Sequence, residues 1–155
     1  MATKKAKAGK KYYTPLEANA ALPLVRAIVQ DIMKLAHELK ERDDRLRRVL
    51  PGEHEVIDRA HREEIDQLQA DLERDQEQMN EYFQELAKLS VELKDPFTGL
   101  LDFRCWLNGR EVYLCWRHGE PAVTHWHDLD AGFAGRQEIR KTDVCGEQIG
   151  MPREV

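Results

Sequence analysis

The sequence LLDFRCWLNGREVYLCW, residues 100–116, decides the fold of the second half of the chain. Apolar and polar residues alternate on both sides of Asn108-Gly109, a pair typical of a type I′ turn because both central positions need positive φ. The stretch therefore predicts an antiparallel β-hairpin in which Phe103 lies opposite Leu114. One face of this hairpin is then apolar. The other face holds Asp102, Arg104, Trp106, Glu111, Tyr113 and Cys115.

Residues 13–94 have the apolar spacing of helices rather than strands. Apolar side chains recur at alternating intervals of three and four along residues 25–50 and again along residues 65–93. Pro51 and Gly52 supply turn residues between the two segments. The pattern predicts a long, coiled-coil-like antiparallel helical hairpin.

The start of the first helix has several agreeing signals. Thr14 can cap the helix, Pro15 suits its first position, and Glu17 completes a capping box with Thr14. Pro23 lacks a backbone donor, so it predicts a kink or a restart of the helix near residues 21–23.

The first helix is apolar on more than one face between residues 20 and 39. The apolar side chains outside the main seam are Leu24, Ile28, Met33 and Leu35. A wide apolar stripe needs a partner besides the other helix. We therefore expect the base of the hairpin to pack on the C-terminal module while its tip projects into water. Self-association as a homodimer through helix one is an alternative use of the same surface.

These elements predict an α+β fold, in which the helical hairpin packs at its base on a small antiparallel sheet of about three strands. A third strand is expected at about residues 122–126. The predicted organisation is a disordered lysine-rich tail (1–12), the helical hairpin (13–94), a small β module with a Gly-rich loop (95–137) and a polar C-terminal tail (138–155).

Charge and composition exclude several functional classes. The net charge is −5 although residues 1–11 contain five lysines and no acid, so the rest of the chain is acidic, which argues against nucleic-acid binding. No apolar run approaches the ~20 residues of a membrane span, and no signal peptide follows the lysines. Three cysteines do not make a disulfide framework, which favours a soluble cytoplasmic protein with reduced thiols.

Three stretches resemble an uncharacterised bacterial family, domain of unknown function 2203. They are YTPLEANAALPLV, VELKDPFTGLLDF and GREVYLCWRHGEPAVTHWHDLDAGFAGRQ. The resemblance implies a small cytoplasmic bacterial protein with a helical N-terminal part and no assigned activity or catalytic residue. Positions within the family motif are Trp116, Gly119, Glu120, Trp126, His127, Gly132, Phe133, Gly135 and Arg136. His118 and His125 lie outside that pattern.

The first candidate site is an anion pocket in residues 120–136. Two glycines three residues apart can expose successive backbone amides, and Arg136 can bind a phosphate or carboxylate. In this hypothesis His127 donates or accepts a proton and Glu120 orients it. The candidate residues are Glu120, His127, Asp130, Gly132, Gly135 and Arg136.

A metal site is the second hypothesis, although no cofactor is predicted outright. Cys115, His118, His125 and His127 are zinc-type ligands. The simplest strand register, with Arg117 opposite Ala122, places Cys115 on the opposite face from His125 and His127, which disfavours a four-ligand site. A looser divalent-metal site would use His127 and Glu120, with His125, Asp128 or Asp130 as further ligands.

The hairpin tip gives a third hypothesis. Its acidic residues Asp43, Asp44, Glu53 and Glu55 could enter the secondary channel of a bacterial RNA polymerase, an analogy of shape alone. The alternative is a solvated hairpin end. Across these hypotheses the sequence favours a non-enzymatic protein-interaction module with a small-anion site. The competing class is a metalloprotein or enzyme centred on His127, Glu120 and Arg136.

Overall fold

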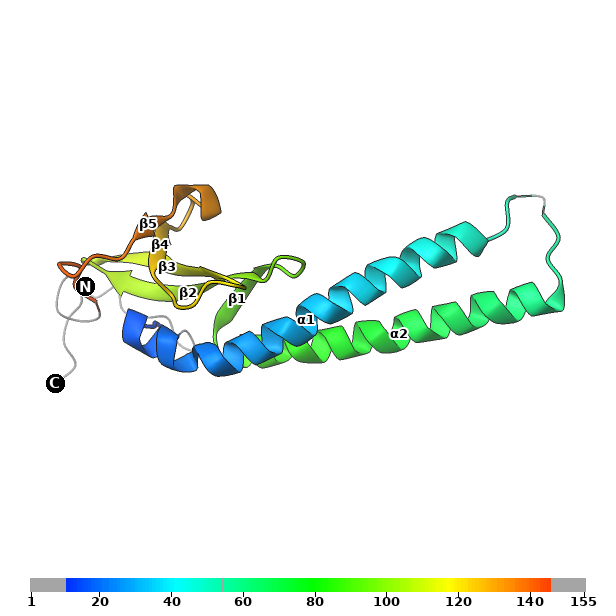
Figure 1. Ribbon diagram of the computed structural model, residues 1–155, viewed down its shortest axis with the longest axis horizontal. Helices are drawn as coiled ribbons and strands as arrows, with labels where there is room; N and C mark the ends of the chain where they lie inside the picture. The colour runs from blue at the N-terminus through cyan, green and yellow to red at the C-terminus, as the bar shows by residue number, and fades with distance from the viewer. Residues whose placement is uncertain (1–10, 54, 146–155) are drawn as a thin grey trace.

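The computed structural model describes residues 11–53 and 55–145, and it has an α+β fold (Figure 1). In this part of the chain, two α-helices precede a single antiparallel sheet whose five strands lie side by side in chain order. The sheet therefore has five strands rather than about three. The strands are β1 (Val91–Asp95), β2 (Leu100–Leu107), β3 (Arg110–Arg117), β4 (His125–Asp128) and β5 (Gln137–Glu138).

The helices α1 (Pro15–Val49) and α2 (Arg59–Lys88) run in opposite directions and separate toward the loop that connects them (Figure 1). The predicted capping box is confirmed, because Thr14 and Glu17 exchange hydrogen bonds of 3.1 and 3.0 Å. Pro23 lies inside one continuous helix, so the predicted restart near residues 21–23 is wrong. Within the described residues, neither helix has the length and apolar character needed to cross a bilayer.

The second helix is shorter than its apolar spacing predicted. It begins after Asp58, whose carboxylate accepts a hydrogen bond from the His61 amide at 2.8 Å, and it ends at Lys88. Ser90 then adopts a φ of +60°, and the following residues form the edge strand β1 instead of a last helical turn. Leu93 fits the helical spacing, but VELKD also alternates as a strand does.

The β2–β3 hairpin has the predicted register. Phe103 lies opposite Leu114, and Asn108 and Gly109 have φ values of +52° and +84°, as a type I′ turn requires. The hairpin's apolar face shares one hydrophobic core with the first half of α1. Buried residues of this core include Leu22, Val25, Val29, Ile32, Leu101, Phe103, Leu107, Val112, Leu114 and Trp116.

Strand β4 begins three residues later than expected and pairs one residue out of the predicted register. Tyr113 lies opposite His127, and Cys115 lies opposite His125. The β3–β4 connection is no tight turn: it reaches α1, where the Val123 amide donates to Asn19 Oδ1 at 2.7 Å. A slip of one residue moves every side chain of a strand to the other face. His127 consequently lies on the same face as Cys115, contrary to the prediction.

The predicted terminal tails fall partly outside the described residues, which begin at residue 11 and end at residue 145. Within them, β5 pairs with β4, and Leu107 forms an isolated bridge with Cys145. The segment after β5 is thus attached to the β2–β3 turn, where the Asn108 amide donates to the Val144 carbonyl at 2.8 Å.

Candidate functional site

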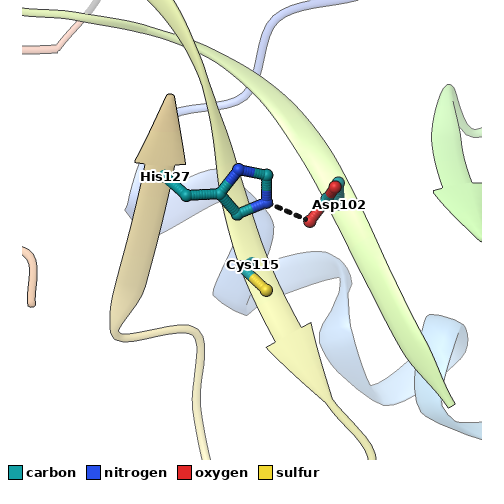
Figure 2. A group of neighbouring side chains, drawn as sticks. All are labelled: Asp102, Cys115 and His127. Carbon is teal, nitrogen blue, oxygen red and sulfur yellow. Dashed lines mark hydrogen bonds and ion pairs between the residues drawn. The ribbon is translucent and has the colours of Figure 1, made fainter. Parts of the chain in front are cut away.

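The polar face of the sheet holds a buried group of three side chains that could bind a metal: Asp102 on β2, Cys115 on β3 and His127 on β4 (Figure 2). Their ligand atoms all lie within 4.8 Å of one another, and the residues are 2%, 0% and 3% exposed. Cross-strand pairing produces the group, because Asp102 lies opposite Cys115 while β4 places His127 beside them.

The hydrogen bonds of His127 fix where its protons are. Its Nδ1 lies 2.7 Å from the Asp128 carbonyl oxygen, which can only accept, so Nδ1 is the donor. In the neutral ring Nε2 then presents its lone pair to Asp102 Oδ1, 3.1 Å away (Figure 2). The His127 Nε2 and Asp102 Oδ1 atoms are then both acceptors, and at this separation a proton or another cation must lie between them.

Burial raises the pKa values of the other two groups, Asp102 and Cys115. Desolvation raises the pKa of Asp102, while the neighbouring His127 and Lys94 act in the opposite direction. Burial, with the Asp102 carboxylate next in effect, raises the pKa of the Cys115 thiol to about 12, and Arg136 opposes this rise. The metal-free site at neutral pH therefore contains a protonated thiol rather than a reactive thiolate.

A cavity of about 310 Å³ lies over this group. It is lined by Lys94, Leu100, Asp102, Tyr113, Cys115, His127, Leu129, Asp130, Gly132 and Phe133. Leu129 and Phe133, in the segment after β4, are large apolar side chains that remain 49% and 37% exposed. The cavity therefore joins buried ionisable groups to an apolar rim, a composition typical of small-molecule sites.

Of the residues expected in an anion pocket, His127, Asp130 and Gly132 line this cavity. Gly135 belongs to the short helix η2 (Phe133–Gly135), which follows the cavity-lining segment. The expected orienting partner of His127 was Glu120, but the structure gives His127 a different partner, Asp102.

Glu120 instead pairs with Arg136, through contacts of 2.8 and 2.9 Å. The guanidinium of Arg136 also lies over the Phe133 ring, 4.6 Å from its centroid. Its Nε atom is buried without a hydrogen-bond partner among the described residues. The arginine expected to bind an anion is therefore already neutralised by a carboxylate and connects the β3–β4 loop to η2.

The other histidines expected near a metal lie elsewhere. His125 shares the face of His127 but is half-buried, and its Nδ1 lies 2.9 Å from the Thr124 hydroxyl. The Nε2 atom of His118 lies 3.3 Å from the Nε2 atom of Gln30 on α1. Within the described residues, the group with metal-ligand geometry contains neither of these histidines, nor Glu120.

The acidic residues of the hairpin tip are mixed with basic ones. Asp43 pairs with Arg47 at 2.9 Å and Asp44 with Lys40 at 3.2 Å, while Glu53 and Glu55 are exposed. A cavity of about 540 Å³ near the tip has both signs of charge in its lining: Glu38, Glu41, Arg42, Asp44, Arg45, Arg48, Leu68 and Asp71. RNA polymerase binding stays a prediction.

Sequence reasoning missed Asp102 as a site residue, although the hairpin register placed it beside Cys115. An acid in the middle of a strand was the available signal, because burying a carboxylate needs a specific partner. That partner, His127, was assigned to the opposite face by the incorrect β3–β4 register. Lys94 was missed as well, because its segment was assigned to the end of the second helix.

Comparisons with known proteins identify a family but no characterised relative. A family model described as an uncharacterized conserved protein, DUF2203, matches residues 11–139, a range that contains every residue of the buried group and its cavity. No curated protein and no solved structure gives a match.

Proposed function

The chain belongs to the DUF2203 family of uncharacterized conserved proteins, and we propose that it binds a divalent transition metal, with zinc as the best fit, through Asp102, Cys115 and His127. One observation supports this most strongly. A buried His127 donates from Nδ1 to a carbonyl and directs Nε2 toward a buried carboxylate, with a thiol within reach. Metal-bound histidines typically make this same outer hydrogen bond.

The donor set favours zinc over hard cations. Carboxylate oxygen, thiolate sulfur and imidazole nitrogen are the common zinc ligands, whereas magnesium and calcium prefer oxygen alone. Ligand atoms of a tetrahedral zinc site lie roughly 3.5 Å apart, given bond lengths of about 2.0–2.3 Å. The three atoms here lie within 4.8 Å of one another, so small side-chain rotations suffice to close the site.

Three protein ligands leave one coordination position free. Structural zinc sites use four protein ligands, while catalytic sites use three and leave the fourth position to water or substrate. The group lines a cavity of about 310 Å³, so an added ligand would have room. We therefore propose a site that acts on or binds a small molecule, in preference to a purely structural metal site.

Metal analysis tests the proposal. We expect purified protein, or protein reconstituted after chelation, to bind one zinc or cobalt per chain, and the cobalt form to show a thiolate-to-cobalt charge-transfer band. Cys115→Ser should abolish this band and His127→Gln should weaken metal binding at least tenfold. Cys145→Ser and His125→Gln are matched controls that should change neither. Absence of metal binding, or a band that survives Cys115→Ser, overturns the proposal.

Self-association is a second and separate proposal. Leu16 and Leu24 on α1 are exposed apolar side chains, and their spacing of eight residues places them on one side of the helix. We propose that this surface forms the contact of a homodimer. Light scattering should give a dimer that Leu24→Glu converts to a monomer, whereas a monomeric wild-type protein at high concentration contradicts the proposal.

A further inference from the structure

We infer that the ligand of this site is a small carboxylic acid with an apolar body, whose carboxylate lies between Lys94 and the free coordination position. This inference rests on the proposed metal site. It starts from the cavity lining, which combines one lysine with three apolar side chains, Leu100, Leu129 and Phe133.

Lys94 supplies the positive charge. It lines the cavity beside Asp102, and its ammonium lies over the Tyr113 ring, 5.3 Å from the ring centroid. Its carboxylate partner, Glu92 at 3.2 Å, is shared with Arg104 at 2.9 Å. Arg104 also pairs with Glu111 at 2.8 Å, so the two carboxylates balance the two cations. The Lys94 ammonium has three N–H donors and gives one to Glu92, so it can still donate to a second anion.

The proposed metal centre has no net charge, so it does not offset the positive charge of Lys94. A divalent cation bound by the Asp102 carboxylate, the Cys115 thiolate and a neutral His127 forms a centre without net charge. Asp130, the other acid that lines the cavity, and Lys94 are both exposed, so water and salt screen both charges. Lys94 is the cation in the cavity lining, and a hydrogen bond from its ammonium favours an anionic group on the ligand.

The rest of the lining distinguishes a carboxylate from a phosphate. Phosphate sites usually combine an arginine fork or several backbone amides, because the ligand has two charges and three or more acceptor oxygens. Among the described residues, Lys94 is the only lysine or arginine in the lining of this cavity, and Arg136, outside the lining, pairs with Glu120. A single lysine suits a monoanion.

The apolar rim of the cavity is the reason to expect an apolar body in the ligand. Leu129 and Phe133 are large apolar side chains at the cavity and are still partly exposed to water. A ligand that covers them removes apolar surface from solvent, and each buried methylene tightens binding about fourfold. We therefore expect affinity to increase with the length of an aliphatic chain attached to the carboxylate.

The test uses cobalt-loaded full-length protein with four ligands: hexanoate, acetate, inorganic phosphate and hexylamine. Binding is measured by calorimetry and by the change in the visible cobalt spectrum. We expect hexanoate to bind at least tenfold tighter than acetate, and phosphate and hexylamine to bind more weakly than hexanoate. Lys94→Gln should weaken hexanoate binding at least tenfold with an unchanged cobalt band, and Phe133→Ala should reduce the preference for hexanoate over acetate.

Lys141→Gln is the matched control, since Lys141 does not line the cavity. Hexanoate binding that is equal in wild type and Lys94→Gln, or phosphate binding that is as tight as hexanoate binding, overturns the carboxylate inference while the metal site stands. A wild-type protein without any cobalt band overturns the metal site itself, so the two failures are distinguishable.

Discussion

Metal affinity should depend steeply on pH, because the Cys115 thiol must lose its proton to bind a metal. Burial and the Asp102 carboxylate raise the pKa of this thiol to about 12. At pH 7 deprotonation therefore costs ~7 kcal/mol, from about five pKa units at 1.36 kcal/mol each. Structural zinc sites gain about 10–16 kcal/mol at pH 7, a value that already includes deprotonation of ordinary thiols at about 2 kcal/mol each. The raised pKa of Cys115 therefore adds about 5 kcal/mol of cost, which zinc can offset with measurable affinity left.

Metal affinity should increase with pH, because the pKa of the Cys115 thiol is raised. Because the metal-free thiol stays protonated throughout the pH range 6–8, each metal ion displaces one proton from Cys115 over that whole range. Affinity should thus rise at least tenfold for each unit of pH.

Competition against a chromophoric chelator at pH 6, 7 and 8 measures this dependence. In Cys115→Ser, a side chain that does not ionise replaces the thiol, so the slope of the logarithm of affinity against pH should fall by about one. Cys145→Ser should retain the wild-type slope. Equal zinc affinity at pH 6 and pH 8 in the wild type would refute the reasoning.

Three further predictions concern the fold that positions the site, and urea unfolding measures each. Gly99→Ala should destabilise the protein by more than about 3 kcal/mol, because positive φ is strained for alanine and its Cβ would lie 2.7 Å from His118 Cβ and 2.8 Å from Met33 Sδ. Gly132→Ala has open space around the Cβ and should cost only the backbone strain of about 1–3 kcal/mol that its φ of +69° and ψ of −170° impose, so equal losses would contradict this contrast. Thr14→Ala should cost ~1 kcal/mol through the lost capping box, and an unchanged stability would show that the cap contributes nothing. Leu101→Ala, in the fully buried core, should cost about 2–5 kcal/mol, with a loss under 1 kcal/mol as the contradicting result.

Features governed by neighbours in sequence could be predicted. The Asn108-Gly109 turn needs positive φ at both positions, and this local requirement alone sets the register of β2 against β3. The capping box depends on two residues three positions apart. The turn and the capping box each involve only a few consecutive residues, so a sequence pattern is enough to predict them.

Features set by distant contacts could not be predicted. The end of α2 is ambiguous in sequence because Leu93 fits both a helical and a strand period, and pairing with β2 decides for the strand. The segment that leads into β4 bonds to α1 through Val123 and Asn19, a contact between residues far apart in sequence. Since one residue of slip exchanges the faces of a strand, contacts of this distant kind separate the observed register, in which His127 joins Asp102 and Cys115, from the one predicted.

X-ray absorption spectroscopy of the zinc-loaded protein tests the metal site most directly. A centre formed by Asp102, Cys115 and His127 predicts a single sulfur at about 2.3 Å, with nitrogen and oxygen ligands at about 2.0–2.2 Å. The sulfur should disappear in Cys115→Ser and persist in Cys145→Ser. A zinc shell without sulfur, or with two or more sulfurs, would contradict the assignment of these three residues as the ligands.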